Sequence, residues 1–147
     1  MFKHILVPTD GSGFSNKAVA TAARLARSLQ AKLLLLHVRS PFETPHHIEG
    51  GALSRLDGKA AIQEIEDEER KLLDAALTIA AADGVKADTA FVAGYSPYDA
   101  IIRIAREQYC DLIVMASHGH GGISALLLGS ETQKVLTHTT IPVLIVR

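Results

Sequence analysis

The chain has 147 residues, of which 48% are hydrophobic, so its size is that of one domain with a single sizeable core. Its 15 basic and 16 acidic residues give a formal charge of −1 at pH 7, so no net positive field favours nucleic acid or an anionic membrane surface. We therefore expect one domain over residues 1–147 with no nucleic-acid partner.

The sequence starts directly with a strand pattern and lacks the charged and then apolar leader of a secreted protein. None of its apolar runs is long enough to cross a bilayer. The single cysteine, Cys110, cannot form an internal disulfide and is typical of a packed residue in a reducing compartment. We expect an unprocessed cytoplasmic protein that does not enter a membrane.

Compact apolar runs predict five strands, in chain order at residues 4–7, 32–38, 87–93, 112–116 and 141–146, of which the third is the weakest. Between them, apolar residues at three- or four-residue spacing predict helices around residues 18–29, 59–82 and 101–105. Continuous apolar strands indicate burial on both faces, and their alternation with helices is typical of parallel sheets. The predicted fold is α/β, a doubly wound, five-stranded and mostly parallel sheet with helices on both faces.

Two surface features accompany the second helix. The preceding segment, residues 39–58, is rich in proline and glycine, which predicts a long mobile loop that could act as a lid. The helix itself carries an acidic run that we interpret as a solvated face. That run consists of Glu64, Glu66, Asp67, Glu68 and Glu69, followed by Arg70 and Lys71.

Residues 115–130, reading MASHGHGGISALLLGS, carry the strongest functional signal. A strand ends in a glycine-rich turn, and a Gly-Ser pair that opens a helix is separated from Gly119 by nine residues. Glycine lets the main chain approach a ligand, and the free N–H groups and dipole at a helix start attract anions. Because ligands of open parallel sheets collect at the carboxyl ends of strands, the pattern indicates a phosphate site there.

The turn after the first strand is the other rich segment. The Asp10 carboxylate could accept hydrogen bonds from a ribose or a ring nitrogen, or approach a metal through water. Taken alone, the residue is better interpreted as a cap or turn residue before a helix that begins near Ser15, because Asp is favoured there. Thr9 and Ser12 share this ambiguity, so the residues alone leave both interpretations open.

The helix opening also has two interpretations. Ser130 and Gln133 fit a capping box, which does not exclude a phosphate contact. Glu131 suits the helix dipole but opposes a nearby phosphate unless it points away or helps to hold a cation. His118 and His120 could donate to a phosphate or pair with it, while zinc is disfavoured because no carboxylate or cysteine stands beside them. The other histidines are interpreted as solvated loop residues (His46 and His47) or structural ones (His4, His37 and His138).

Four segments together resemble the universal stress protein family, in its ATP-binding branch: KHILVPTDGS, LLLLHV, MASHGHGGISALLLGS and IPVLIVR. The family pattern is a glycine, two residues, a second glycine, nine residues, and then Gly-Ser or Gly-Thr. This chain has Gly119, Gly129 and Ser130 in place, but Ala116 stands where the first glycine belongs. A methyl group there costs only local space if φ is negative, and lowers affinity if φ is positive or the nucleotide touches it.

The resemblance implies ATP as the ligand, with Mg²⁺ or Mn²⁺ carried on the phosphates and mostly without protein ligands. Carried over by position, it places adenosine against Pro8, Thr9, Asp10, Val38 and Met115. It places the phosphates against His118, Gly119, Gly129, Ser130 and Thr132, with Ala116 and Glu131 in the same site. It also implies a homodimer through the last strand, residues 141–146, which would otherwise leave an apolar edge.

Our leading hypothesis is a cytoplasmic stress-response protein that works as an ATP-dependent switch with at most slow hydrolysis. Efficient phosphoryl transfer generally requires a lysine that holds the phosphates, a nearby arginine and a base that aligns water. The turn holds no lysine, has no arginine beside it and has no evident base. A receiver domain is disfavoured, because Ala93-Gly94 and Ile141-Pro142 stand where that fold needs an acceptor Asp and a Lys. Two alternatives to the leading hypothesis remain.

The first alternative is a dimeric scaffold of the same family that binds no nucleotide, which Ala116 and Glu131 keep open. The second is an adenylate-transferring enzyme. Such enzymes usually carry His-x-Gly-His or Ser-Gly-Gly-x-Asp-Ser after the first strand, where this chain has Thr9-Asp10-Gly11-Ser12-Gly13.

Overall fold

The computed structural model describes residues 1–40, 58–120 and 127–147. Its elements are β1 (His4–Pro8), α1 (Gly13–Leu29), β2 (Lys32–Arg39), α2 (Gly58–Ala82), β3 (Asp88–Ala93), α3 (Pro97–Glu107), β4 (Leu112–Ala116), α4 (Ser130–His138) and β5 (Val143–Val146). The predicted strand ends agree with these to within two residues. The predicted lid falls almost entirely on residues 41–57, which lie outside the described part of the chain. Two glycines of the predicted phosphate turn, Gly121 and Gly122, also lie outside it.

The sheet has five strands in the order β3-β2-β1-β4-β5, and each neighbouring pair is parallel. The chain moves outward from β1 through β2 to β3, and then returns to the other side of β1 to add β4 and β5. The direction of winding therefore reverses between β1 and β4. In doubly wound folds, this switch point is where loops diverge and leave room for a ligand.

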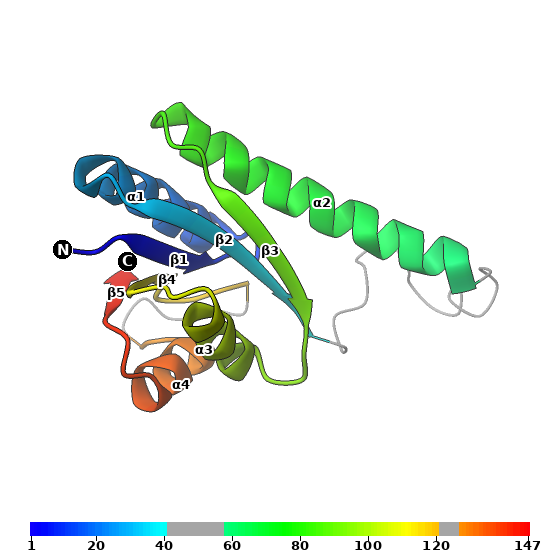
Figure 1. Ribbon diagram of the computed structural model, residues 1–147. Helices are drawn as coiled ribbons and strands as arrows, with labels where there is room; N and C mark the ends of the chain where they lie inside the picture. Colours follow the sequence, from blue (N-terminus) through cyan, green and yellow to red (C-terminus); the bar gives the residue numbers. More distant parts are fainter. Residues whose placement is uncertain (41–57, 121–126) are drawn as a thin grey trace.

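Helices cover both faces of the sheet, as predicted: α1 and α2 lie on one side, and α3 and α4 on the other (Figure 1). Alternate residues along β1 enter opposite cores, since Ile5 and Val7 pack with α1 and α2 while Leu6 packs with α3 and α4. Each of these side chains is fully buried. Burial on both faces explains why the strand sequences are apolar without alternation.

One part of the sequence interpretation was wrong. Glu69 does not belong to a solvated face, because it is only 8% exposed and points toward β2. Its Oε1 lies 3.4 Å from Nη1 of Arg39, the last residue of β2. Burial raises the pKa of Glu69, while the positive charges of Arg39 and His37 oppose that rise. The ion pair with Arg39 therefore lets the Glu69 carboxylate face the sheet, although the run of charges along the helix predicted that it would face solvent.

Cys110 and three histidines have the structural roles predicted for them. Cys110 packs in the core beneath α3, where burial, with a smaller effect of the Asp111 charge, raises the pKa of its thiol to about 11. Nδ1 of His4, His37 and His138 donates to the carbonyl oxygens of Gln108, Thr9 and Lys134, respectively. No helix among the described residues is long and apolar enough to span a membrane.

Candidate functional site

The turn after β1 is held by hydroxyl groups. Thr9 is buried, its N–H donates to the carbonyl oxygen of Leu36 on β2, and its Oγ1 lies 3.1 Å from Oγ of Ser15. Ser12 caps α1, because its Oγ accepts a hydrogen bond from the Ser15 N–H at 3.2 Å. Gly11 between them has φ of +78°, a conformation that glycine adopts without steric cost. The chain thus turns sharply from β1 into α1.

Asp10 connects this turn to the turn after β4. Its Oδ1 accepts from the Ser12 N–H at 2.9 Å, and its Oδ2 accepts from the His120 N–H at 2.9 Å. His120 Nε2 in turn donates to the Asp10 carbonyl oxygen at 2.8 Å, so this nitrogen carries the proton. Burial by itself would raise the pKa of Asp10, but the hydrogen bonds from Ser12 and His120 lower it overall. Asp10 is therefore an ionised turn residue that joins two loops.

The chain after β4 stays buried before it reaches the glycine turn. Ser117 and His118 are 4% and 8% exposed, and Ser117 Oγ lies 3.0 Å from His118 Nδ1. At Gly119, a Cβ atom would collide with the Asp10 carboxylate. A side chain at this position would have to displace the Asp10 carboxylate, which hydrogen bonds to both turns hold in place.

The start of α4 is fixed to the end of β4 by two hydrogen bonds. Gly129 is the N-cap, and its N–H donates to the Ser117 carbonyl oxygen at 2.7 Å. Thr132 Oγ1 donates to the Ala116 carbonyl oxygen at 3.0 Å. Because a glycine N-cap has no side-chain acceptor, the N–H groups of the first turn remain available to a ligand.

The capping box predicted for Ser130 and Gln133 is wrong. Ser130 is the first helical residue and not the cap, and no side chain caps α4. Gln133 Nε2 donates instead to the carbonyl oxygen of Leu128, at 2.8 Å. The close contact of Gly129 with Ser117 shifts the helix start by one residue relative to the sequence pattern.

Glu131 contacts two neighbours, although it lines the site. Its Oε2 accepts from the Tyr98 N–H at 2.8 Å, in the first turn of α3, and its Oε1 lies 3.1 Å from Lys134 Nζ. The positive end of the α3 dipole and the lysine both offset the carboxylate charge. Repulsion of a bound phosphate is therefore weaker than the sequence indicated.

Ala116 is the last residue of β4, and φ is not positive there. Its peptide groups belong to the sheet, because it pairs with Val146 of β5. Of the two conditions under which a methyl group would lower affinity, the structure excludes positive φ. It does not exclude contact with a ligand, because Ala116 lines a cavity at the carboxyl ends of the strands.

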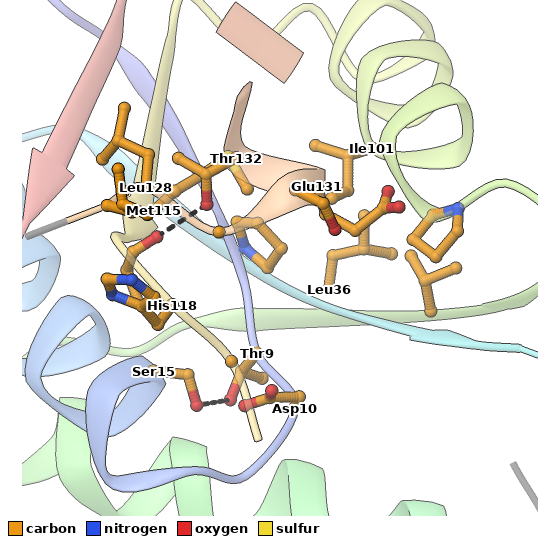
Figure 2. Close-up of a pocket in the computed structure, with 18 residues that line it drawn as sticks. Thr9, Asp10, Ser15, Leu36, Ile101, Met115, His118, Leu128, Glu131 and Thr132 are labelled. Atoms are coloured by element: carbon orange, nitrogen blue, oxygen red, sulfur yellow. Dashed lines mark hydrogen bonds between the residues drawn. The ribbon is translucent and has the colours of Figure 1, made fainter. Parts of the chain in front are cut away.

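A cavity of about 500 Å³ opens at the carboxyl ends of β1, β2 and β4. Figure 2 shows its walls, with Thr9, Asp10 and Ser15 on one side and Leu36, Ile101 and Glu131 on another. All twelve residues that the sequence assigned to the nucleotide line it: Pro8, Thr9, Asp10, Val38, Met115, Ala116, His118, Gly119, Gly129, Ser130, Glu131 and Thr132.

Six further lining residues were not predicted: Ser15, Leu36, Pro97, Ile101, Leu127 and Leu128. Leu36 was within reach of sequence analysis, because it precedes Val38 by two positions and so lies on the same face of β2. Pro97 and Ile101 belong to α3, which only the tertiary packing brings over this edge of the sheet. Among the described residues, no cluster of three or more His, Cys, Asp or Glu side chains has the geometry of a metal site.

Comparison with known proteins agrees with this architecture. Residues 1–147 match the model of the universal stress protein family. Over 149 residues that include all of both chains, the sequence is 38% identical to universal stress protein YxiE of Bacillus subtilis (strain 168). It is 30% identical to universal stress protein MJ0577 of Methanocaldococcus jannaschii, over 159 residues that include all of this chain and 96% of the relative.

The solved structures give the same result. The structure of MJ0577 superposes with a TM-score of 0.76 at 28% identity, over 99% of this chain and 96% of the other. A universal stress protein in complex with cAMP superposes with a TM-score of 0.72 at 27% identity, over 99% of this chain and 97% of the other. The match of the family model over all 147 residues, together with these relatives, shows that the chain belongs to the universal stress protein family.

Proposed function

We propose that the protein binds ATP in the cavity at the ends of β1 and β4 and acts as a nucleotide-dependent switch. The single observation that carries the proposal is the division of this cavity into an apolar part and a part rich in backbone N–H groups. A nucleotide has the same two parts. A relative that superposes over nearly the whole chain binds cAMP, which has the same base and a phosphate.

The apolar part is formed by Leu36, Val38, Ile101 and Met115, which come from β2, α3 and β4. These side chains offer an apolar slot for an adenine ring between the sheet and α3. The Thr9 and Ser15 hydroxyl groups stand at its edge, within the same cavity. We assign the base to the slot and the ribose to this polar edge.

The phosphate part lies at the start of α4. The first-turn N–H groups of Ser130, Glu131 and Thr132 follow a glycine cap, and the helix dipole adds a partial positive charge. His118 lines the same side. We assign the phosphates to this end of the cavity.

We further propose that Mg²⁺ or Mn²⁺ reaches the site on the phosphates and takes few ligands from the protein. Both carboxylates in the cavity already have partners, since Asp10 accepts two N–H groups and Glu131 contacts Tyr98 and Lys134. Because both carboxylates line the cavity, they could still accept hydrogen bonds from the water molecules of a hydrated cation, and magnesium commonly keeps such waters when it binds beside phosphates.

The same contacts argue for slow hydrolysis. Asp10 contacts the glycine turn through the His120 N–H, and its lowered pKa makes it a weak base. A switch is the better use of the site, because one ligand would touch β1, β2, α3, β4 and α4 together. We propose a homodimer through β5 as the readout of this switch, and a cytoplasmic location on account of the single, buried cysteine.

The proposal is tested by calorimetric titration of Mg-ATP into the wild type and Gly119→Val, after any carried-over nucleotide has been released by heat and identified. We expect saturable micromolar binding by the wild type and none by the variant, since the valine displaces the Asp10 carboxylate and blocks the backbone. The matched control is Gly94→Val, where a Cβ would meet only Ala100 at 3.9 Å, outside the cavity.

Two results would contradict the proposal. Equal affinity in Gly119→Val would exclude this cavity as the ATP site. A wild type that releases no nucleotide and binds none would favour the dimeric scaffold instead.

A further inference from the structure

A second cavity of about 510 Å³ adjoins the first at the N-terminal end of α1. Its described lining residues are Gly11, Ser12, Gly13, Phe14, Lys17, Gly119 and His120. Gly119 lines both cavities, so the two are neighbours across the glycine turn. The proposed ATP site uses none of the other six residues.

The side chains of the second cavity differ from those of the first. Phe14 is 41% exposed, and its ring centroid lies 5.8 Å from that of His118, which lines the first cavity. Lys17 follows one turn later on α1 and is exposed. The described lining of the first cavity contains no lysine or arginine, so Lys17 adds the positive charge that the glycine turn lacks.

Hydrogen bonds hold the boundary between the cavities, where Asp10 lines the first cavity and His120 lines the second. Asp10 and His120 form it through two hydrogen bonds, of 2.9 and 2.8 Å. Gly119 lines both cavities and places no side chain between them. Both Asp10 oxygens accept N–H groups, which offsets the negative charge that a phosphate chain would meet there.

We propose that the two cavities together bind a dinucleoside polyphosphate. The first adenosine occupies the slot assigned above, so this inference rests on the proposed function. The phosphate chain crosses at Gly119, Lys17 pairs with its distal phosphates, and the second base stacks on Phe14. ATP alone could use only Lys17 in the second cavity, through its terminal phosphate. The exposed ring of Phe14, in a cavity as large as the first, suits a second nucleoside as well.

The test is a calorimetric titration with ATP and with diadenosine tetraphosphate, at equal magnesium and ionic strength. We expect the wild type to bind the dinucleotide roughly tenfold more tightly than ATP, the gain from one stacked base and one ion pair. Phe14→Leu keeps the apolar bulk and removes the ring, and Lys17→Gln removes the charge. Each variant should lose most of the preference for the dinucleotide.

Arg24→Gln is the matched control, because Arg24 is exposed on the same helix, outside both cavities, and its loss changes net charge equally. It should keep the preference. A second readout is the NMR spectrum of the phenylalanine rings, in which the Phe14 signals should shift with the dinucleotide and not with AMP.

Equal affinity of the wild type for the two ligands would overturn the inference and leave the ATP site standing. A preference that survives in both Phe14→Leu and Lys17→Gln would overturn it as well. Failure of the wild type to bind either ligand would remove the proposed function, and this inference with it.

Discussion

At the scale of single residues, Asp10 shows how a side chain that lines a site can also hold the surrounding loops together. Its sequence context fits a ligand contact or a turn, and the structure shows the turn: both oxygens accept backbone N–H groups from the loops after β1 and β4. The residue shapes the site by fixing the distance between those loops. Ligand contacts from Asp10 would come in addition to this structural role.

Asp10→Asn should destabilise the protein by about 1–3 kcal/mol at pH 7, because an amide cannot accept both charge-assisted bonds. Hydrogen bonds lower the pKa of Asp10 in the folded state, so its contribution to stability is present above the usual value of 3.8 and is lost as the pH falls through the folded pKa. Urea unfolding between pH 7 and pH 3 should therefore show the difference between wild type and variant shrinking in acid. A difference that is constant with pH would mean that the carboxylate charge is not what holds the loops.

At the scale of elements, the junction between β4 and α4 sets the position of the phosphate end. A Cβ on Gly129 would lie 3.1 Å from the Ser117 carbonyl oxygen and 3.4 Å from the His118 Cα, so the backbones would have to move apart slightly to accept a methyl group. This contact also explains the failed capping box. The spacing of Ser130 and Gln133 in the sequence cannot show that the end of β4 already holds the start of α4 through hydrogen bonds.

Gly129→Ala should therefore lower the free energy of unfolding by about 1–3 kcal/mol, because the methyl group pushes α4 away from β4. The same shift should weaken ATP binding, since the first-turn N–H groups move with the helix. Gly13→Ala is the control: nothing lies within 4 Å of its Cβ, and alanine at a helix start should be neutral or stabilising. Urea unfolding of both variants gives the comparison, and equal stability would contradict the packing argument.

At the scale of the whole molecule, β5 leaves one edge of the sheet open. The carbonyl oxygens of Pro142 and Val146 accept from the N–H groups of Ile113 in β4 and of Ser117 just after it, and backbone groups alternate in direction along a strand. The N–H and C=O groups of Val143 and Ile145 consequently face away from the sheet. Leu144 between them is 39% exposed, so the edge is both apolar and able to pair.

Sedimentation equilibrium should give the wild type twice the 15.7 kDa mass of one chain. Leu144→Lys should shift it toward the monomer, because two lysines would meet across the symmetric edge. Ile62→Lys is the control, since Ile62 is 59% exposed on α2 and does not border β5. A monomeric wild type, or dissociation of both variants, would contradict a dimer through β5. Repeating the experiment with Mg-ATP tests whether ligand changes the equilibrium, as a switch requires.

The sequence by itself determined the element order and the parallel sheet, because apolar runs without alternation mark strands that are buried on both faces. Its glycine-rich turn after the fourth strand indicated a site where strands end, and its resemblance to the universal stress protein family named the twelve residues that line one cavity. Only the tertiary structure decided features that join distant segments: the Glu69 pair with Arg39, the fixing of Asp10 by His120, the wall that α3 supplies, and Lys17 beside the glycine turn. The physical reason is that each depends on distances between elements, which packing sets and periodicity along one chain does not contain.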